Sequence, residues 1–294
     1  MNKVLANKKA VFIFMFPAIL FFVVIICIPI FMSIYYSLTE WNGMGDKTFV
    51  GFANYIKLFT FKDGVFLTSL KNSLILAVLS LLIQLPVGMI LAMILARGIK
   101  GEKIFLTIFF VPVIISTVAI GQLWIKLYNP DYGLVNTFLR QFGLDKLCRA
   151  WLGEKNTALG AVLVPIVWQY IGYYMLLFYS SIKSISKDII EAAKIDGASY
   201  FRTCISIMLP DIKPMIQAAV TFSVIGSLKV YDLVYVLTNG GPSHHTEVPS
   251  TLMVWTIFKR NDYGFGSSMA VIIILECFLA MLLIKKCFKK EEEV

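Results

Sequence analysis

Uncharged runs of apolar residues recur along the chain and are separated by short polar segments. Four of these runs each reach the roughly 20 residues that a helix needs to cross about 30 Å of hydrocarbon. Two further segments, nearer the C-terminus, are equally apolar except for Lys229, Asp232 and Glu276. The pattern predicts an all-α membrane protein with six transmembrane helices. Their expected bounds are about 11–36, 72–96, 104–127, 157–182, 215–237 and 266–284.

Composition supports a membrane protein. Of the 294 residues, 58% are hydrophobic and 15% are charged, whereas a soluble domain carries about 25% charged residues. The first apolar run is longer than the roughly 7 to 15 residues of a secretory signal core, and the sequence after it offers no small-x-small cleavage site. We therefore count this run as the first span.

The distribution of basic residues predicts the orientation in the membrane. Four segments hold 15 of the 27 Lys and Arg residues: the start of the chain with Lys3, residues 97–103, residues 183–213, and the end of the chain. Cytoplasmic connections are enriched in these residues, so both termini are expected to face the cytoplasm. The net charge of +9 then reflects topology and contact with anionic lipid, and no pattern indicates nucleic-acid binding.

A polar connection at residues 183–213 is longer than a helix hairpin requires, with 31 residues and nine charges. Its first part predicts an amphipathic helix from Ser186, with Ile189 and Ala193 on the apolar face and Glu191 on the charged face. Glycine readily adopts positive φ, so Asp196-Gly197 is expected to end this helix. The connection should therefore form a helix–turn–helix.

The second helix of the connection is expected to place Phe201, Ile205 and Met208 on one apolar face, since they recur at i, i+4 and i+7. It should end at Leu209-Pro210, because proline disfavours the α conformation of the residue before it. Taken alone, the pattern favours an amphipathic segment that rests on lipid, with Asp188 as the N-cap.

Three short motifs change this interpretation. They are Glu191-Ala192-Ala193, Asp196-Gly197-Ala198 and Leu209-Pro210. At this spacing, one span before the end of the bundle, they resemble the EAA signature of binding-protein-dependent ABC importer permeases. The stretches FVPVIISTVAIGQLW, YNPDYGLVN, VWQYIGYYMLLFYSSIKSI and VYDLVYVLTNGGP are similar to carbohydrate-uptake permeases of the maltose-transporter type. The LTNGGP of residues 237–242 resembles the first-named permease of such systems, here in a compact six-span form.

The resemblance implies the architecture of a type I ABC importer permease in a bacterial cell membrane. It implies a second permease, two cytoplasmic ATP-binding subunits docked on residues 187–210, and an extracellular or periplasmic sugar-binding protein. Glu191 would pair with a basic residue of the ATPase, and Gly197 would allow close approach at the turn. The chain has no G-x-x-x-x-G-K-[ST] motif, so ATP hydrolysis is expected in partner subunits and no catalytic residue is assigned. The residues expected to couple to the ATPase are Glu191, Ala192, Ala193, Asp196, Gly197, Ala198, Phe201, Leu209 and Pro210.

A carbohydrate path requires aromatic, amide and hydroxyl groups inside the bundle. In the fourth span, Gln169 and Tyr173 share one face at i, i+4, and the resemblance implies that such positions line the substrate site. An aromatic belt at the membrane interface is the alternative. In the fifth span, Ser227, Tyr231 and Tyr235 share another face. The predicted substrate path comprises Trp168, Gln169, Tyr173, Ser227, Tyr231, Asp232 and Tyr235.

Two other classes of function were weighed. An ion-coupled secondary transporter would use Glu276, Lys229 and Asp232, with Lys229 and Asp232 close enough to pair on one helical face. The absence of a visible inverted repeat argues against it. A membrane enzyme would need a motif such as H-E-x-x-H or G-x-S-x-G, and the sequence has neither. The five cysteines form no C-x-x-C pair, so no disulfide, metal or cofactor is expected.

Overall fold

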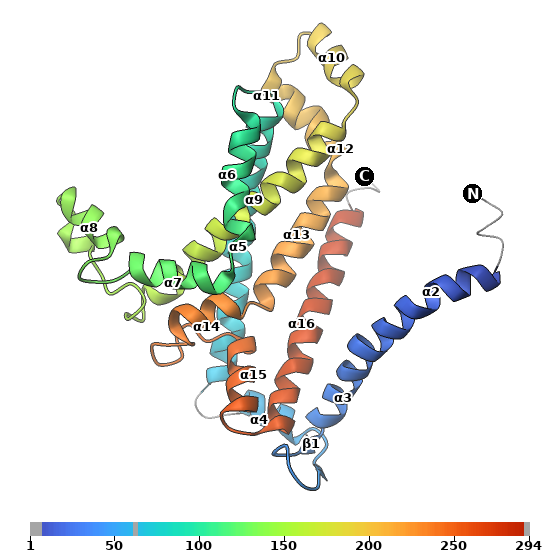
Figure 1. Cartoon of the computed structure of the whole chain (residues 1–294), viewed down its shortest axis with the longest axis vertical. Coiled ribbons are helices and arrows are strands. Elements are labelled where there is room, and N and C mark those ends of the chain that lie inside the picture. The colour runs from blue at the N-terminus through green and yellow to red at the C-terminus, as the bar shows by residue number, and fades with distance from the viewer. Residues whose placement is uncertain (1–7, 61–63, 291–294) are drawn as a thin grey trace. The chain divides into compact units, whose positions relative to one another are not determined.

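The computed structural model describes residues 8–60 and 64–290, and these residues are mostly helical (Figure 1). Lys3, counted above among the basic residues, lies outside them. The first half contains α2 (Lys8–Phe22), a π-helical turn (Val23–Cys27), α3 (Ile28–Ser37), β1 (Thr39–Glu40), β2 (Thr48–Phe49), α4 (Ala53–Thr60), α5 (Val65–Ala96), α6 (Glu102–Ile114), α7 (Thr117–Leu127), α8 (Leu134–Gln141) and a 3₁₀ turn (Asp145–Leu147). The second half contains α9 (Ala158–Ser184), α10 (Lys187–Ile195), α11 (Tyr200–Thr203), a π-helical turn (Cys204–Met208), α12 (Leu209–Asp211), α13 (Lys213–Leu228), α14 (Asp232–Thr238), α15 (Pro249–Phe258) and α16 (Tyr263–Lys290).

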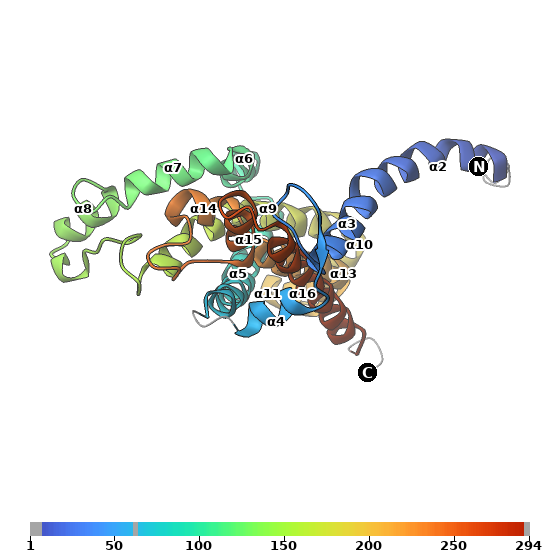
Figure 2. The same ribbon diagram turned by 90° about the horizontal axis from the view of Figure 1, so that it is seen from below.

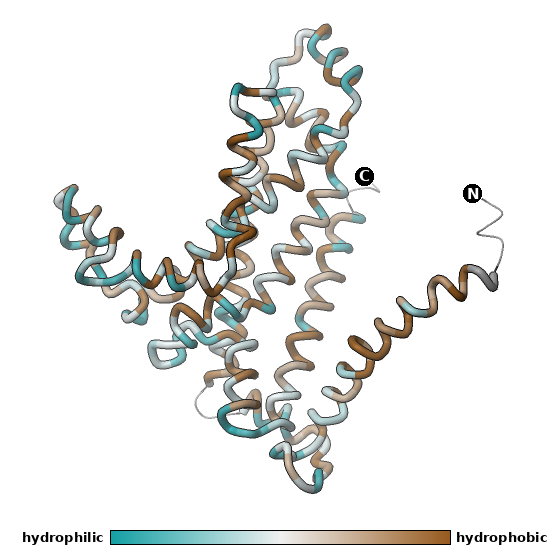
Figure 3. Tube along the Cα trace, in the orientation of Figure 1, coloured by the Kyte–Doolittle hydropathy of each residue, from teal (hydrophilic) through white to brown (hydrophobic). Residues whose placement is uncertain are grey.

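Four helical segments in the described part are long and apolar enough to cross a membrane: Val11–Ser37, α5, α9 and α16. The pairs α6 with α7 and α13 with α14 also qualify, but each pair is bent, by 96° and 40° respectively. Counting each bent pair as one span gives up to six spans. In Figure 3 the apolar colour runs along α6 and α16, whereas polar residues recur in the region of α10.

The helices expected over 104–127 and 215–237 are therefore not continuous. Ile115 and Ser116 have extended backbone, with ψ of 140° and 130°, and separate α6 from α7. A β-branched residue followed by Ser disfavours helix continuation, because the first is stiff and the second competes for backbone hydrogen bonds. Between α13 and α14 the helix is interrupted from Lys229 to Tyr231.

The chain divides into two compact units. Of the described residues, one unit contains 8–60 and 253–272. In it β1 pairs antiparallel with β2, Thr39 opposite Phe49 and Glu40 opposite Thr48. The Asn54 amide donates to the carbonyls of Ser37 and Thr39, both at 2.9 Å. The backbone N–H of Tyr263 donates to the Trp41 carbonyl at 3.0 Å, so the start of α16 is tied to the β1 turn.

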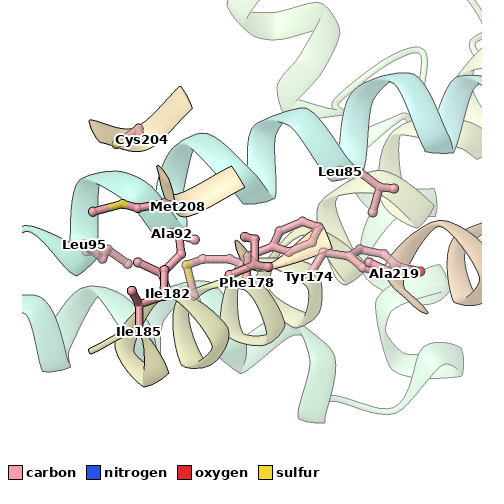
Figure 4. Packing of buried hydrophobic residues seen from close by; sticks show 12 residues of the cluster. Leu85, Ala92, Leu95, Tyr174, Phe178, Ile182, Ile185, Cys204, Met208 and Ala219 are labelled. Carbon is pink, nitrogen blue, oxygen red and sulfur yellow. The ribbon is translucent and has the colours of Figure 1, made fainter. Parts of the chain in front are cut away.

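The other unit contains the described residues 64–252 and 273–290, and α9 is its central helix. Within the most apolar window of α9, 61% of the residues are buried, against 0% for Val11–Ser37. Its neighbours α5, α6, α13 and α14 pack around it. Figure 4 shows one of its two cores, where Tyr174 and Phe178 of α9 lie against Leu85 and Ala92 of α5. Positions on α9 therefore set the geometry of the whole unit.

The crossing of α9 with α6 depends on Gly172. A methyl group placed on Gly172 would overlap the backbone carbonyl of Phe109. Backbone atoms cannot rotate away as a side chain can, so a larger residue must push the two helices apart. Gly160 lies near the start of the same helix and has open space around its Cβ position.

We predict that Gly172→Ala destabilises the protein by about 1–3 kcal/mol, the usual cost of overpacking a core. Gly160→Ala is the matched control, because Ala is favoured over Gly by up to about 1 kcal/mol within a helix. Thermal unfolding of both variants in detergent measures the difference. Equal midpoints for the two variants would show that α6 and α9 do not cross closely at Gly172.

Candidate functional site

The connection expected between the fourth and fifth spans is folded, and we call residues 186–212 the polar module. Ser186 caps α10, with its hydroxyl accepting from the Asp188 N–H at 3.3 Å. The cap is therefore Ser186 and not Asp188, which instead lies in the first turn. Gly197 has φ +75°, and the Ala198 N–H donates back to the Ala193 carbonyl at 2.9 Å. Gly197 thus ends α10 with the positive φ that glycine accepts without a Cβ clash.

The second half of the module differs from the sequence prediction. The helix does not stop at Leu209-Pro210 but continues through α12, and Leu209 has φ −61° and ψ −46°. The Leu209 N–H donates five residues back, to the Cys204 carbonyl, in a π-helical turn. A wider π turn directly before Pro210 makes room for a ring that would otherwise clash with the preceding turn. The same arrangement precedes Pro29, where the turn is Val23–Cys27.

The π turn also changes which residues of the module are buried. Thr203, Cys204 and Met208 are buried, whereas Phe201 is 74% exposed and Ile205 is 48% exposed. Phe201, Ile205 and Met208 were expected to share one buried face, and this prediction is wrong for Phe201 and Ile205. The π-helical turn contains one more residue than an α-helical turn, so the side chains before it are rotated relative to Met208.

On α10, Ala193 is buried, whereas Glu191 and Ala192 are exposed and Ile195 is 86% exposed. Asp196, Gly197 and Pro210 are exposed as well, and Ala198 and Leu209 are half-buried. The outer face of the module combines charged and large apolar side chains. That composition suits a protein partner better than water alone.

The inner face of the module packs on α5 and α9. In Figure 4, Cys204 and Met208 lie beside Leu95 and Ala92 of α5. Tyr200 adds a polar attachment, because its hydroxyl donates to the Met93 carbonyl near the end of α5. The Arg97 guanidinium lies 4.6 Å from the centre of the Tyr200 ring. Burial raises the pKa of the Tyr200 hydroxyl, so it stays protonated and able to donate.

The Met93 carbonyl needs such a donor. In a regular helix it would accept from the Arg97 N–H, but that group donates to the Ile94 carbonyl at 3.4 Å. Near the module α9 is tied to α6, because Lys183 at the end of α9 is 3.5 Å from Glu102 in the first turn of α6. The Tyr179 hydroxyl also donates to Glu102. The polar module is thus fastened to the end of α5, and the adjoining end of α9 is fastened to α6.

A cavity of about 570 Å³ lies between α5, α9, α13 and α14. Tyr170, Tyr173 and Tyr174 of α9 line it from one side. From the other side it is lined by Ser223, Ser227, Lys229, Tyr231 and Asp232, and Gln84 of α5 and Thr117 of α7 add further polar groups. Hydroxyl, amide, aromatic and charged groups therefore converge on one space. These groups are suited to a polyhydroxylated ligand.

Four of the residues predicted for the substrate path line this cavity: Tyr173, Ser227, Tyr231 and Asp232. The other three lie outside its lining. Trp168 packs edge-on to Trp124 at 6.0 Å, and Tyr235 stacks on Tyr231 at 5.2 Å. Gln169 is 2% exposed, and its amide nitrogen lies 3.4 Å from the Thr117 hydroxyl. Gln169 thus joins α9 to α7 behind the cavity.

The aromatic cluster of the fourth span includes Tyr170 and Tyr174, but the predicted path omits them, and it omits Gln84 and Ser223 as well. Tyr170, Tyr173 and Tyr174 have the i, i+3, i+4 spacing of one helical face, and this signal could have identified them. Lys229 and Asp232 were expected to pair on one helix face. Instead they lie on either side of the break between α13 and α14, and no ion pair joins these two described residues.

Glu276 lies in α16, as expected for the sixth span. Its Oε2 is buried, with no hydrogen-bond partner among the described residues. The cysteines of the described chain are free thiols. No group of three His, Cys, Asp or Glu side chains in residues 8–60 and 64–290 is arranged to hold a metal ion.

Comparison with known proteins decides the family. The sequence profile described as "Binding-protein-dependent transport system inner membrane component" matches residues 84–289. The chain belongs to this family. The match contains the polar module and almost all of the cavity lining, so the resemblance carried by the EAA motifs is confirmed.

Several relatives of this permease family match the chain over most of their length. A probable ABC transporter permease protein, YurN of Bacillus subtilis, is 37% identical over 98% of each chain. The diacetylchitobiose uptake system permease protein NgcF of Streptomyces coelicolor is 36% identical over 86% of this chain and 74% of that protein. The fold is similar to that of a chain from a bacterial ABC transporter involved in alginate import, with a TM-score of 0.83, 21% identity and 98% coverage of both chains.

We predict that Tyr200→Phe weakens the attachment of the polar module to α5. It keeps the ring under Arg97 but leaves the Met93 carbonyl without this donor, at a cost of about 1 kcal/mol. Hydrogen exchange of the amides in residues 199–212 should become faster. Phe201→Leu is the control, because Phe201 is exposed and its replacement removes no described hydrogen bond. Unchanged exchange in Tyr200→Phe would mean that the hydroxyl bond does not hold the module.

Proposed function

We propose that this permease is one of two membrane subunits of a bacterial ABC importer for a sugar or oligosaccharide. Named relatives support a carbohydrate. They include the diacetylchitobiose permease above and the trehalose/maltose transport system permease protein MalF of Thermococcus litoralis, which is 30% identical over 90% of this chain and 89% of that protein. A second alginate importer structure, solved with its periplasmic protein bound to an alginate pentasaccharide, has a TM-score of 0.81, 22% identity and coverage of 96% of this chain and 94% of that one. It supports a sugar-binding protein as an external partner.

The two-faced polar module is the observation that carries the proposal. One face is fastened to α5 and α9, and the other presents Glu191, Ile195 and Phe201 to the outside. The Glu191 carboxylate forms no ion pair with another described residue, so it is available to a basic group of a partner. Two cytoplasmic ATP-binding subunits are the proposed drivers, with one docked on residues 187–210. Closure of the ATPase pair would then tilt the module and the two helices beneath it as one body.

The cavity is proposed to be the part of the translocation path that this chain contributes. A second permease would close it and supply the remaining contacts. In the proposed orientation both termini and the polar module face the cytoplasm, in line with the basic residues around them. The cavity would then open toward the second permease within the membrane, between the module and the external partner.

Substitution of Gly197 tests the docking. We predict that Gly197→Asp leaves the chain in the membrane but greatly lowers the amount of ATPase that co-purifies with it, and with it sugar uptake. A side chain at φ +75° costs about 1 kcal/mol in local strain, and it also fills space at the proposed interface. Glu191→Ala should have the same effect more weakly, since it removes one partner of an interface ion pair.

Gly45→Asp is the matched control. Gly45 has φ +71°, and like Gly197 it has open space at its Cβ position, but it lies outside the polar module. Backbone strain is therefore nearly equal in the two variants, which differ in whether the new side chain lies on the polar module. If both variants retain ATPase equally, or lose it equally, the polar module is not the docking surface.

Substitution of Tyr173 tests the path. Tyr173→Ala should lower uptake several-fold and leave the yield of assembled transporter unchanged, because it removes a ring from the cavity lining. Tyr132→Ala is the control, since Tyr132 is an exposed tyrosine outside the cavity. Uptake that is equal in the two variants would favour the aromatic-belt alternative for α9.

A further inference from the structure

The segment around α8, residues 129–153, extends away from the core of its unit. The chain turns by 96° between α6 and α7, and Figure 2 shows α7 and α8 leading away from α5 and α9. Figure 1 places α8 on the same side of α7 as α6, level with part of α6 along the long axis. Since α6 belongs to a membrane span, α8 lies beside that span and not beyond its end.

The α8 segment is held together by its own polar contacts. Asn136 is 2% exposed, and its amide nitrogen donates to the carbonyls of Arg149 and Pro130 at 2.9 and 3.2 Å. Its Oδ1 accepts from the Trp151 indole at 2.8 Å. The orientation of α8 is therefore fixed, and the side chains that it exposes form a defined surface.

One exposed face of α8 is apolar. Leu134, Phe138 and Phe142 recur at i, i+4 and i+8 and are 61–65% exposed. The rings of Phe138 and Phe142 lie 4.6 Å apart. Ile114 at the end of α6 and Leu123 in α7 are exposed as well, so exposed apolar side chains recur along the segments that lead to α8.

Basic residues follow the apolar face of α8. Lys146 and Arg149, just after α8, are exposed, as is Asp145 beside them. Arg140 lies on the face of α8 opposite Phe138 and Phe142, and its guanidinium donates to the carbonyls of Pro130 and Asp131. A short helix with aromatic and leucine side chains on one face and a basic residue on the other is suited to the headgroup–acyl boundary of a bilayer.

We propose that α8 is an interfacial anchor that inserts Leu134, Phe138 and Phe142 into the leaflet farther from the polar module. Its occupant is lipid, because α8 lies beside a membrane span, its apolar face is exposed, and Lys146 and Arg149 next to it can reach anionic headgroups. The anchor holds α7 in place, and Thr117 at the start of α7 lines the cavity. The proposal concerns lipid contact alone and does not depend on the transported substrate.

Fluorescence quenching in lipid nanodiscs tests the anchor. In a background where the five cysteines are serine, Phe142→Cys and Phe138→Cys carry an environment-sensitive fluorophore in the assembled transporter. Nitroxide lipid should quench both several-fold more than the same label on Thr137→Cys, which is turned about 100° round the helix from Phe138. An aqueous quencher should show the opposite order. Phe138 and Phe142 lie on the same face, so if one labelled variant fails to fold, the other still tests the proposal.

Two results would overturn the proposal. Strong quenching of the Phe142 and Phe138 labels by the aqueous reagent would show that the face is open to water. Weak quenching by both reagents in the assembled transporter would show that a protein subunit covers it. Nitroxide quenching that is equal at Thr137, Phe138 and Phe142 would also contradict a one-sided insertion.

Discussion

The close crossing of α9 with its neighbours is the constraint on which the rest of this permease depends. Gly172 lets the α9 backbone meet the α6 backbone, and Gly88 of α5 has little room for a side chain beside Met175 of α9. Dispersion contacts fall off steeply with separation, so helices that meet at backbone distance are held as a rigid pair. The cavity is built on one part of this assembly and the polar module on another.

This arrangement offers a physical route between the module and the cavity. The module is attached to α5 through Tyr200 and the core around Met208, and α9 runs from Lys183 beside the module to the tyrosines of the cavity. In the proposed function, a displacement of the module by an ATPase moves both helices together. The cavity wall formed by α13 and α14 is different, because its helix is broken beside Lys229. That break gives one wall a separate point of bending.

Much of the architecture could be predicted from the sequence, because local sequence patterns determine most of the helices and turns. Uncharged runs identified the apolar helices, and Asp196-Gly197 identified the turn of the polar module. The break at Ile115-Ser116 lies in an uncharged run, and the mean hydropathy of a run does not show whether its helix changes direction. The π turn before Pro210 rotated Phe201 out of the expected face, because a spacing rule assumes one helical period throughout. Gln169 was expected in the cavity, but its bond to Thr117 arises from packing between distant segments, which spacing along one helix cannot show.

In the proposed function, ATP hydrolysis in partner subunits drives uptake through this chain. The most direct measurement is uptake of a radiolabelled oligosaccharide into vesicles that contain the assembled transporter, with its binding protein outside and ATP inside. The account predicts that vanadate abolishes uptake and that a protonophore leaves it intact. Uptake that resists vanadate and collapses with the protonophore would contradict the account and favour ion coupling through Glu276, Lys229 and Asp232.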